Sequence, residues 1–408
     1  MGVELKLKSV DLKDKEMEKE IKRFLDFTGY DYWEKIIDKI DTVEGRFYKE
    51  LYLLKRNPFI RSLKQYFQLI KEGKSIWKHT SEDLINLARN VFIINRVSYN
   101  LNDNGKNLIR GRLRNENGIR PFLFELEIAT HFFRRGLDVE FLEYEASNTS
   151  GKTFEFLVSG DGIEREIECK WKSIDAGRKI TRSGFYILCD EISKRVVPNI
   201  KGKRCLVELI CNKNLGTDQK TFIKISNDIL QSINDGKTEL ISDEHFRIKI
   251  DYLQDDLIIK SDEQFVSAIT PYYSEKSHFV VISNSDATVI VKVESEEKDK
   301  VLDSIYEELK GATRKFTGKR PALIACYIAG IESHQWKELR GENGLSRMTT
   351  YLLSKENTNH IHTIGYSSEP DPIIIERIKD FKSEGLFFSN LNCLYNKGED
   401  IFFVKRQS

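Results

Sequence analysis

The stretch Thr153-Phe-Glu-Phe-Leu-Val-Ser-Gly-Asp-Gly-Ile-Glu-Arg-Glu-Ile-Glu-Cys-Lys170 largely alternates apolar and polar residues on both sides of a central Asp161-Gly162 pair. This pair is the preferred loop of a two-residue type I′ turn, so the stretch predicts a β-hairpin. With these residues in the loop, Glu155 lies directly opposite Glu168. Opposite residues share one face of a sheet, so the hairpin brings two carboxylates together.

The two faces of this hairpin differ in character. One face is apolar apart from Arg165, which predicts that it covers a hydrophobic core. Like charges placed opposite each other destabilise a sheet, so the carboxylates on the other face need something to offset their repulsion. A divalent cation between them is one interpretation, and solvation of a hairpin at the surface is the other. The second face carries Thr153, Glu155, Leu157, Glu164, Glu166, Glu168 and Lys170.

A helix is predicted immediately before the hairpin, over residues 121–135, and Gly136 ends it. At about 100° per residue, Glu125 falls on the apolar face of this helix, between Ala129 and Phe132. A buried carboxylate without a partner is costly, so Glu125 should have one. An ion pair with an arginine or lysine is one alternative, and a third carboxylate directed at the hairpin site is the other.

These segments together resemble the PD-(D/E)XK superfamily, the restriction-endonuclease-like nucleases. The superfamily's helix motif is matched at Phe124-Glu125, Ile128-Ala129, Phe132 and Gly136, and its (D/E)-x-K motif at Glu168-Cys169-Lys170. Phe154-Glu155 stands where the family usually has Pro-Asp. The match covers residues 121–172, and the later order of predicted elements fits as far as residue 235.

The resemblance implies an α/β protein (α+β overall) with a core of helix, three strands, helix and strand. We place this core at residues 119–236, after a polar stretch with glycines over residues 102–118. Residues 1–118 show amphipathic periodicity and predict a helical domain for docking or regulation. Residues 237–408 predict a further α/β region, either an extension of the core or a separate sensing or assembly domain.

The resemblance also implies metal-dependent hydrolysis of phosphodiester bonds, with Mg²⁺ or Mn²⁺ as cofactor. These ions prefer hard oxygen ligands and lower the pKa of bound water. The expected ligands are Glu155, Glu168 and the backbone carbonyl of Cys169. Glu125 would bind a second metal or hold the first through water, and Lys170 would orient the attacking water or help to deprotonate it.

Basic residues gather after the hairpin, although the whole chain has a formal net charge of only +1. Residues 170–204 hold ten lysines and arginines against three acids, which suits a phosphate backbone. A second basic cluster, residues 310–320, lies between a predicted helix (296–311) and a predicted strand (322–331). A solvated surface is the alternative for both. The expected nucleic-acid contacts are Lys172, Arg178, Lys179, Arg182, Arg314 and Lys315.

Composition places the 408-residue chain among globular proteins, and its six cysteines lack CxxC spacing, which is typical of reduced thiols in the cytoplasm. The N-terminus is too charged for a signal peptide, and no apolar run is long enough to cross a membrane. By resemblance, we expect a homo-oligomer, in the form of a dimer, that acts on DNA rather than RNA in prokaryotic restriction or antiviral defence. A partner protein would bind the N-terminal or C-terminal region.

Two other functions stay open. Glu155 in place of aspartate favours a nuclease fold that has lost catalysis and binds nucleic acid or a protein partner. The other is a structural partner protein with the hairpin at its surface. His360 and His362 share a predicted strand face, where packing is favoured over a zinc site because no third ligand is evident. Pro370-Asp371 is interpreted as a chance match to the nuclease motif.

Overall fold

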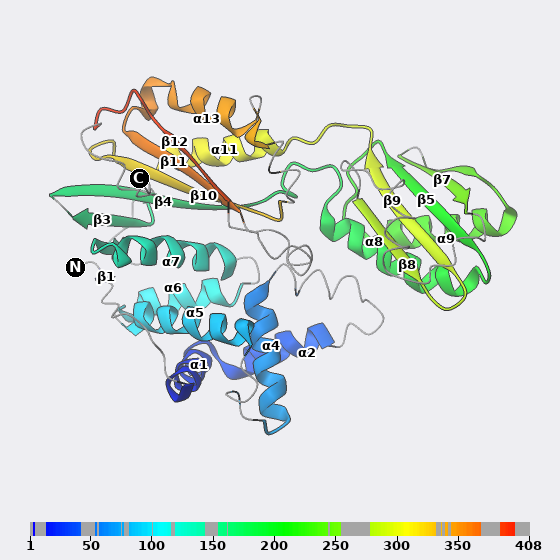
Figure 1. Ribbon diagram of the computed structural model, residues 1–408, viewed down its shortest axis with the longest axis horizontal. Coiled ribbons are helices and arrows are strands. Elements are labelled where there is room, and N and C mark those ends of the chain that lie inside the picture. Colours follow the sequence, from blue (N-terminus) through cyan, green and yellow to red (C-terminus); the bar gives the residue numbers. More distant parts are fainter. Residues whose placement is uncertain are drawn as a thin grey trace. The chain divides into compact units, whose positions relative to one another are not determined.

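The computed structural model divides the chain into two compact units (Figure 1). Unit 1 comprises Met1–Ile40, Leu54–Ile174 and Leu302–Ser408, and unit 2 comprises Asp41–Leu53 and Asp175–Val301. The structure describes residues 3–4, 14–41, 54, 57–74, 76, 81–99, 101–115, 119–142, 154–160, 162–243, 245–253, 278–331, 336, 339–341, 344–368 and 384–395. Both units combine helices with a mixed sheet, so the predicted α/β class is confirmed.

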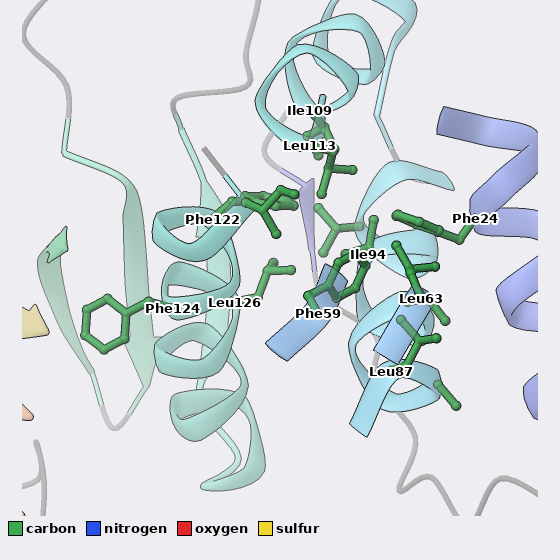
Figure 2. Packing of buried hydrophobic residues seen from close by; sticks show 14 of the residues in the cluster. Phe24, Phe59, Leu63, Leu87, Ile94, Ile109, Leu113, Phe122, Phe124 and Leu126 are labelled. Atoms are coloured by element: carbon green, nitrogen blue, oxygen red, sulfur yellow. The ribbon is translucent and has the colours of Figure 1, made fainter. Parts of the chain in front are cut away.

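The first helices of unit 1 are α1 (Asp14–Thr28), α2 (Tyr30–Asp41), α4 (Pro58–Lys71), α5 (Glu82–Tyr99) and α6 (Asp103–Leu113). Their apolar faces join one hydrophobic cluster with α7 (Ile119–Arg134) and the sheet, so the helices share the core of the sheet (Figure 2). Helix α6 occupies the stretch where the sequence predicts a boundary. The side chain of Asn102 caps this helix by accepting a hydrogen bond from the N–H of Gly105.

Helix α7 has the form that the sequence predicts, and the chain turns at Gly136 with φ 81°. Helix α7 is buried on two sides, one against the other helices of unit 1 and one against the sheet. Figure 2 shows Phe122 and Leu126 directed toward the other helices and Phe124 directed toward the sheet. Glu125 lies within this buried face, as the sequence predicts. The helix therefore carries a carboxylate into the interior of unit 1.

The sheet of unit 1 has the strand order β1-β2-β3-β4-β10-β11-β12. Its first four strands pair antiparallel, β10 and β11 run parallel to β4, and β12 is antiparallel to β11. Every residue of β10 is buried, as expected for a strand covered on both faces. The strands are β1 (Val3–Glu4), β2 (Asp138–Phe141), β3 (Phe156–Gly160), β4 (Ile163–Ser173), β10 (Ala322–Ala329), β11 (Ile361–Ser368) and β12 (Glu384–Ser389).

Strands β3 and β4 form the predicted hairpin in the predicted register, with Gly160 opposite Ile163 and Phe156 opposite Ile167. Gly162 in the turn has φ 74°, the left-handed conformation that a type I′ turn requires. The predicted core face packs under α7, whereas α11 (Val301–Thr313) lies on the other side of the sheet with α13 (Leu345–Leu353) (Figure 1).

Unit 2 has its own five-stranded sheet in the order β6-β7-β5-β9-β8, with α8 (Arg182–Arg195) and α9 (Gln219–Asp235) packed in its hydrophobic cluster. Strand β5 is antiparallel to β7 and parallel to β9. The strands are β5 (Arg204–Cys211), β6 (Glu239–Asp243), β7 (Phe246–Tyr252), β8 (His278–Ser283) and β9 (Thr288–Ser295).

This division corrects the sheet that the sequence analysis assigns to residues 119–236. The helix and strand that follow the hairpin in sequence, α8 and β5, belong to unit 2. The strand that pairs with β4 is β10, from Ala322↔Glu166 to Ala329↔Ser173. A helix followed by an apolar strand occurs in both places, and local periodicity does not reveal which strand joins which sheet.

Residues 175–301 are thus inserted between β4 and α11. Hydrogen bonds join the first residues of this insertion to its last residues, next to the points where the chain leaves unit 1 and returns to it. Lys300 N–H donates to the carbonyl of Gly177 over 2.7 Å, and Lys179 N–H donates to Asp299 Oδ1 over 2.9 Å. Gly177 has φ 97°, and a Cβ atom there would lie 2.5 Å from the Lys300 carbonyl oxygen, so a glycine is required.

Two further expectations concern the whole chain. All six cysteines are buried and carry free thiols, so their predicted burial is confirmed. Among the helices that the structure describes, none has both the length and the apolar character needed to cross a bilayer.

Candidate functional site

Two buried carboxylates meet at the open end of the hairpin, away from its turn. Glu168 on β4 faces away from the core cluster and its side chain has no exposed area, while Glu155 immediately before β3 is also buried. Cys169 N–H donates to Glu155 Oε2 over 2.9 Å. Burial first, and then the neighbouring Glu168 and Glu125, raise the pKa of Glu155 well above its ordinary value, against the opposing effect of Lys315.

Two lysines neutralise this carboxylate pair. Lys170 Nζ and Lys315 Nζ each lie 2.7 Å from Glu168 Oε1, and Lys315 Nζ lies 3.5 Å from Glu155 Oε1. Oε2 of Glu168 is shielded from solvent and has no hydrogen-bond partner among the described residues. The carboxylates are therefore not solvated at a surface, and the interpretation of a surface hairpin is wrong.

Lys315 belongs to a loop that closes over the acidic face of β4. We call residues 314–320 the basic loop; it connects α11 with β10. Thr317 donates to Glu166 from its N–H, over 2.8 Å, and from its hydroxyl group. Arg320 pairs with Glu164 at 2.6 Å and with Glu166 at 3.4 Å. The acidic residues of β4 are thus matched by groups about 150 residues later in the chain, which places Lys315 at the site.

Aromatic packing also holds the basic loop. The ring of Phe316 stacks on Phe154 with 6.3 Å between centroids and lies edge-on to His360 at 5.9 Å. The hydroxyl group of Tyr395 donates to the carbonyl of Gly318 over 2.8 Å. Phe154, at the position where the motif that this segment resembles usually has proline, is therefore a packing partner of the basic loop.

Glu308 on α11 contacts the lysines of β4 from the side of the sheet opposite α7. Its carboxylate lies 3.8 Å from Lys170 Nζ and 3.2 Å from Lys172 Nζ. Lys172, an expected nucleic-acid contact, is therefore ion-paired within the protein. Glu308 could not be identified from the sequence, because it is one acid among several in an amphipathic helix and no local signal distinguishes it.

Glu125 has a partner on α6. Arg112 donates to both carboxylate oxygens of Glu125, at 2.8 Å for the longer bond, and its guanidinium lies over the ring of Phe122. The structure thus shows the ion pair that was one of the two alternatives for this acid. Glu125 still acts on the site through space, because it contributes to the raised pKa of Glu155 and of the buried Cys169 thiol.

The other expected nucleic-acid contacts are distributed over both units. Arg314 is exposed in the basic loop. Arg178, Lys179 and Arg182 belong to unit 2. There Arg178 lies 3.9 Å from Asp175, Lys179 pairs with Glu297, and Arg182 begins α8. The structure thus brings Lys315 to the carboxylates and places these three residues in the inserted unit.

The histidine pair shows the packing that was favoured over a zinc site. His360 and His362 are both buried, and burial lowers the pKa of His360. His362 Nδ1 lies 2.8 Å from the hydroxyl group of Thr363. Residues 370 and 371, the second Pro-Asp pair, lie outside the described part of the chain.

The donor set suits a divalent cation in its chemistry, although the described residues contain no group of three or more histidine, cysteine, aspartate or glutamate side chains arranged around one point. Two carboxylates with hard oxygen atoms converge, and one of their buried oxygen atoms, Glu168 Oε2, has no hydrogen-bond partner there. An ammonium group, that of Lys315, contacts both carboxylates. The site therefore already binds a cation between its acids.

Comparison of the chain with protein-family models, with curated proteins and with solved structures found no match in any of the three. The resemblance of residues 121–172 to the PD-(D/E)XK superfamily stays a prediction. The charged side chains that the structure brings together at this site are those of Glu155, Glu168, Lys170 and Lys315.

Proposed function

We propose that the protein is a metal-dependent nuclease that hydrolyses phosphodiester bonds in DNA. The observation that carries this proposal is the meeting of Glu155, Glu168 and Lys170 at one buried site, where Lys170 lies 2.7 Å from Glu168 and Lys315 contacts both carboxylates. Buried groups with strongly perturbed ionisation are characteristic of functional sites. The proposal makes this cluster the catalytic centre.

The order of elements in unit 1 supports the proposal. Helix α7, strands β2, β3 and β4, helix α11 and strand β10 follow one another once residues 175–301 are set aside as an insertion. This order of helix, three strands, helix and strand is what the family resemblance implies. The (D/E)-x-K segment, Glu168 to Lys170, lies on β4, the strand between the hairpin partner β3 and the parallel neighbour β10.

In this function, Glu155, Glu168 and the carbonyl of Cys169 would hold Mg²⁺ or Mn²⁺. The ion supplies charge stabilisation at phosphorus and lowers the pKa of a bound water. Lys170, held between Glu168 and Glu308, would orient the attacking water and neutralise negative charge. Glu125, whose oxygen atoms are held by Arg112, would set the electrostatic field around Glu155 and not bind metal directly.

The proposal extends to the partners of the protein. DNA would contact the exposed Arg314 of the basic loop, together with basic residues of unit 2. A homodimer would cut both strands of a duplex, and a role in prokaryotic restriction or antiviral defence would give the inserted unit 2 and the N-terminal helices a part in sensing or assembly. These are consequences of the proposed chemistry, and each depends on it.

A second candidate function is a nuclease-like fold without catalysis that binds nucleic acid or a protein. One specific observation favours it. Lys315 pairs with the two carboxylates and Glu155 replaces the usual aspartate, so an ammonium group takes the place of the catalytic cation. Metal-dependent cleavage decides between the two candidates.

The test is cleavage of supercoiled plasmid, linear duplex, single-stranded DNA and RNA, with Mg²⁺, Mn²⁺ or EDTA. It compares the parent protein with Lys170→Ala and with Lys22→Ala, an exposed lysine of α1 that serves as matched control. We expect metal-dependent cutting of DNA that Lys170→Ala loses by about a hundredfold or more and Lys22→Ala keeps. Absence of cutting, together with salt-sensitive DNA binding, would favour the binding module.

A further inference from the structure

Lys315 holds an unusual position for a residue in a connecting loop. Its ammonium group lies 2.7 Å from Glu168 Oε1 and 3.5 Å from Glu155 Oε1, so it contacts both carboxylates of the site. Lys170 contacts the same oxygen atom of Glu168 from within β4. With both lysines charged, the two glutamates are neutralised by the protein alone.

The rest of the basic loop is fixed independently of Lys315. Thr317 and Arg320 hold the loop to Glu166 and Glu164, and Phe316 packs on Phe154. The Lys315 side chain itself is about one-third exposed, whereas that of Glu168 is fully buried. The ammonium group of Lys315 can therefore leave the carboxylates by a change of side-chain rotamer while the loop stays in place.

An ammonium group and a divalent cation would compete for these oxygen atoms. Two positive groups at contact distance from one carboxylate oxygen repel each other by several kcal/mol even when the surroundings screen them well. Lys170 projects from a central strand and is also held by Glu308, whereas Lys315 reaches the site from a loop and is more exposed. Of the two lysines, Lys315 is the one that can yield its position.

We propose that Lys315 is the resident counterion of the carboxylate pair, that a divalent cation displaces it, and that the displaced ammonium group then contacts the scissile phosphate. This inference rests on the proposed nuclease function and adds to it a second lysine with two positions. It accounts for a buried carboxylate pair that remains neutralised without metal. It also delivers a positive charge to the substrate phosphate only when the metal is in place.

The first experiment measures binding of Mn²⁺ alone to the full-length protein, without nucleic acid, from the electron paramagnetic resonance signal of free Mn²⁺. Lys315→Gln removes the competing charge and should bind Mn²⁺ on the order of tenfold more tightly than the parent. Lys315→Arg keeps the charge and should bind no more tightly than the parent. Lys319→Ala, an exposed lysine of the same loop, is the matched control and should leave the affinity unchanged.

The second experiment follows single-turnover cleavage at saturating Mn²⁺. Despite its tighter metal binding, Lys315→Gln should cleave roughly tenfold or more slowly than the parent, with partial rescue in Lys315→Arg. Thermal unfolding of each variant verifies that it is folded. A folded Lys315→Gln variant with the Mn²⁺ affinity and cleavage rate of the parent would overturn the inference while leaving the nuclease function intact.

The remaining outcomes separate the inference from the function on which it rests. Tighter Mn²⁺ binding by Lys315→Gln, with no cleavage by any variant, would support displacement of Lys315 and overturn its role toward phosphate together with the nuclease function. Failure of every variant to bind Mn²⁺ would overturn both. A loss of Mn²⁺ affinity in Lys315→Gln would overturn displacement alone.

Discussion

Each sheet carries charged residues on the face turned away from its main hydrophobic cluster, but the two sheets balance these charges in different ways. In unit 2, Glu208 on β5 lies directly opposite Lys292 on β9, whose ammonium group is 2.9 Å from Glu208 and 2.9 Å from Glu294. Burial works against the charge of Lys292, yet its hydrogen bonds to these glutamates raise the pKa of the lysine. The charged state is therefore favoured by neighbours within the same sheet.

In unit 1 the hairpin balances its own charges only in part, through the pair of Lys170 with Glu168. Glu155 and Glu168 are buried together, and the pKa of Glu155 is raised, so its charged state is disfavoured by burial and by Glu168. Part of the compensation comes from Lys315 in the basic loop, far away in sequence. Strongly perturbed ionisation is characteristic of functional sites, so we expect the cluster around Glu155 to be functional and the cluster around Lys292, which is balanced within its own sheet, to be structural.

The largest difference between the carboxylate cluster of unit 1 and the charge cluster around Lys292 in unit 2 should appear in cleavage activity when one carboxylate of each cluster is neutralised. Glu168→Gln should lower metal-dependent cleavage by roughly a thousandfold, because it removes a charge that would hold the metal. Glu208→Gln should leave cleavage unchanged and lower the free energy of unfolding by no more than about 1 kcal/mol. Single-turnover cleavage and chemical denaturation measure the two effects. Equal losses of cleavage in both variants would contradict the distinction.

A second comparison concerns ion pairs between helices within unit 1. Arg112→Met leaves the buried Glu125 without its partner and should lower the free energy of unfolding by about 3 kcal/mol, as expected when one member of a buried pair is removed. Arg61→Met breaks a pair with Asp83 that has similar geometry and is about one-third exposed, and should lower it by less than about 1 kcal/mol.

Urea denaturation of the two arginine variants measures this difference. The double variant Arg112→Met with Glu125→Gln should recover most of the lost stability, because the buried charge that Arg112 compensated is gone. A loss in Arg112→Met no larger than that in Arg61→Met would show that Glu125 does not depend on this partner.

The smallest expected effect is a dependence of stability on pH. The pKa of Glu155 lies above 4.5 in the folded protein. Between pH 4.5 and the folded-state pKa, Glu155 therefore binds more protons in the folded state than in the unfolded chain. Stability contributed by protonated Glu155 is present below 4.5 and is lost as the pH rises through the folded-state pKa.

Glu155→Gln should remove this loss and be more stable than the parent at neutral pH. Thermal unfolding from pH 4.5 upward compares the two proteins. Glu294→Gln in unit 2 is the control, and we expect it to give no gain in stability at neutral pH, because Glu294 stabilises Lys292. If the stability of the parent protein rose with pH over this interval as much as the stability of Glu155→Gln, the raised pKa of Glu155 would be contradicted.

Much of the local structure could be predicted, because it depends on neighbours in sequence. The hairpin register followed from the Asp161-Gly162 turn and the alternation of residues around it, and the burial of Glu125 followed from helical periodicity. Helix α6 (Asp103–Leu113) was missed because polar residues and glycines dominate the stretch in which it lies. Its Arg112 is nevertheless the partner of Glu125.

The sequence by itself determined the class of the fold, the hairpin, the helix that precedes it, and the facts that Glu155 and Glu168 share a face and that Lys170 follows them. These depend on turn chemistry and on the periods of strand and helix, which are local properties. Tertiary structure alone decided that β10 and not β5 pairs with β4, that residues 175–301 form an insertion, and that Lys315 and Glu308 reach the site. Pairing between distant strands and burial of charge depend on which surfaces meet, and local periodicity carries no information about that choice.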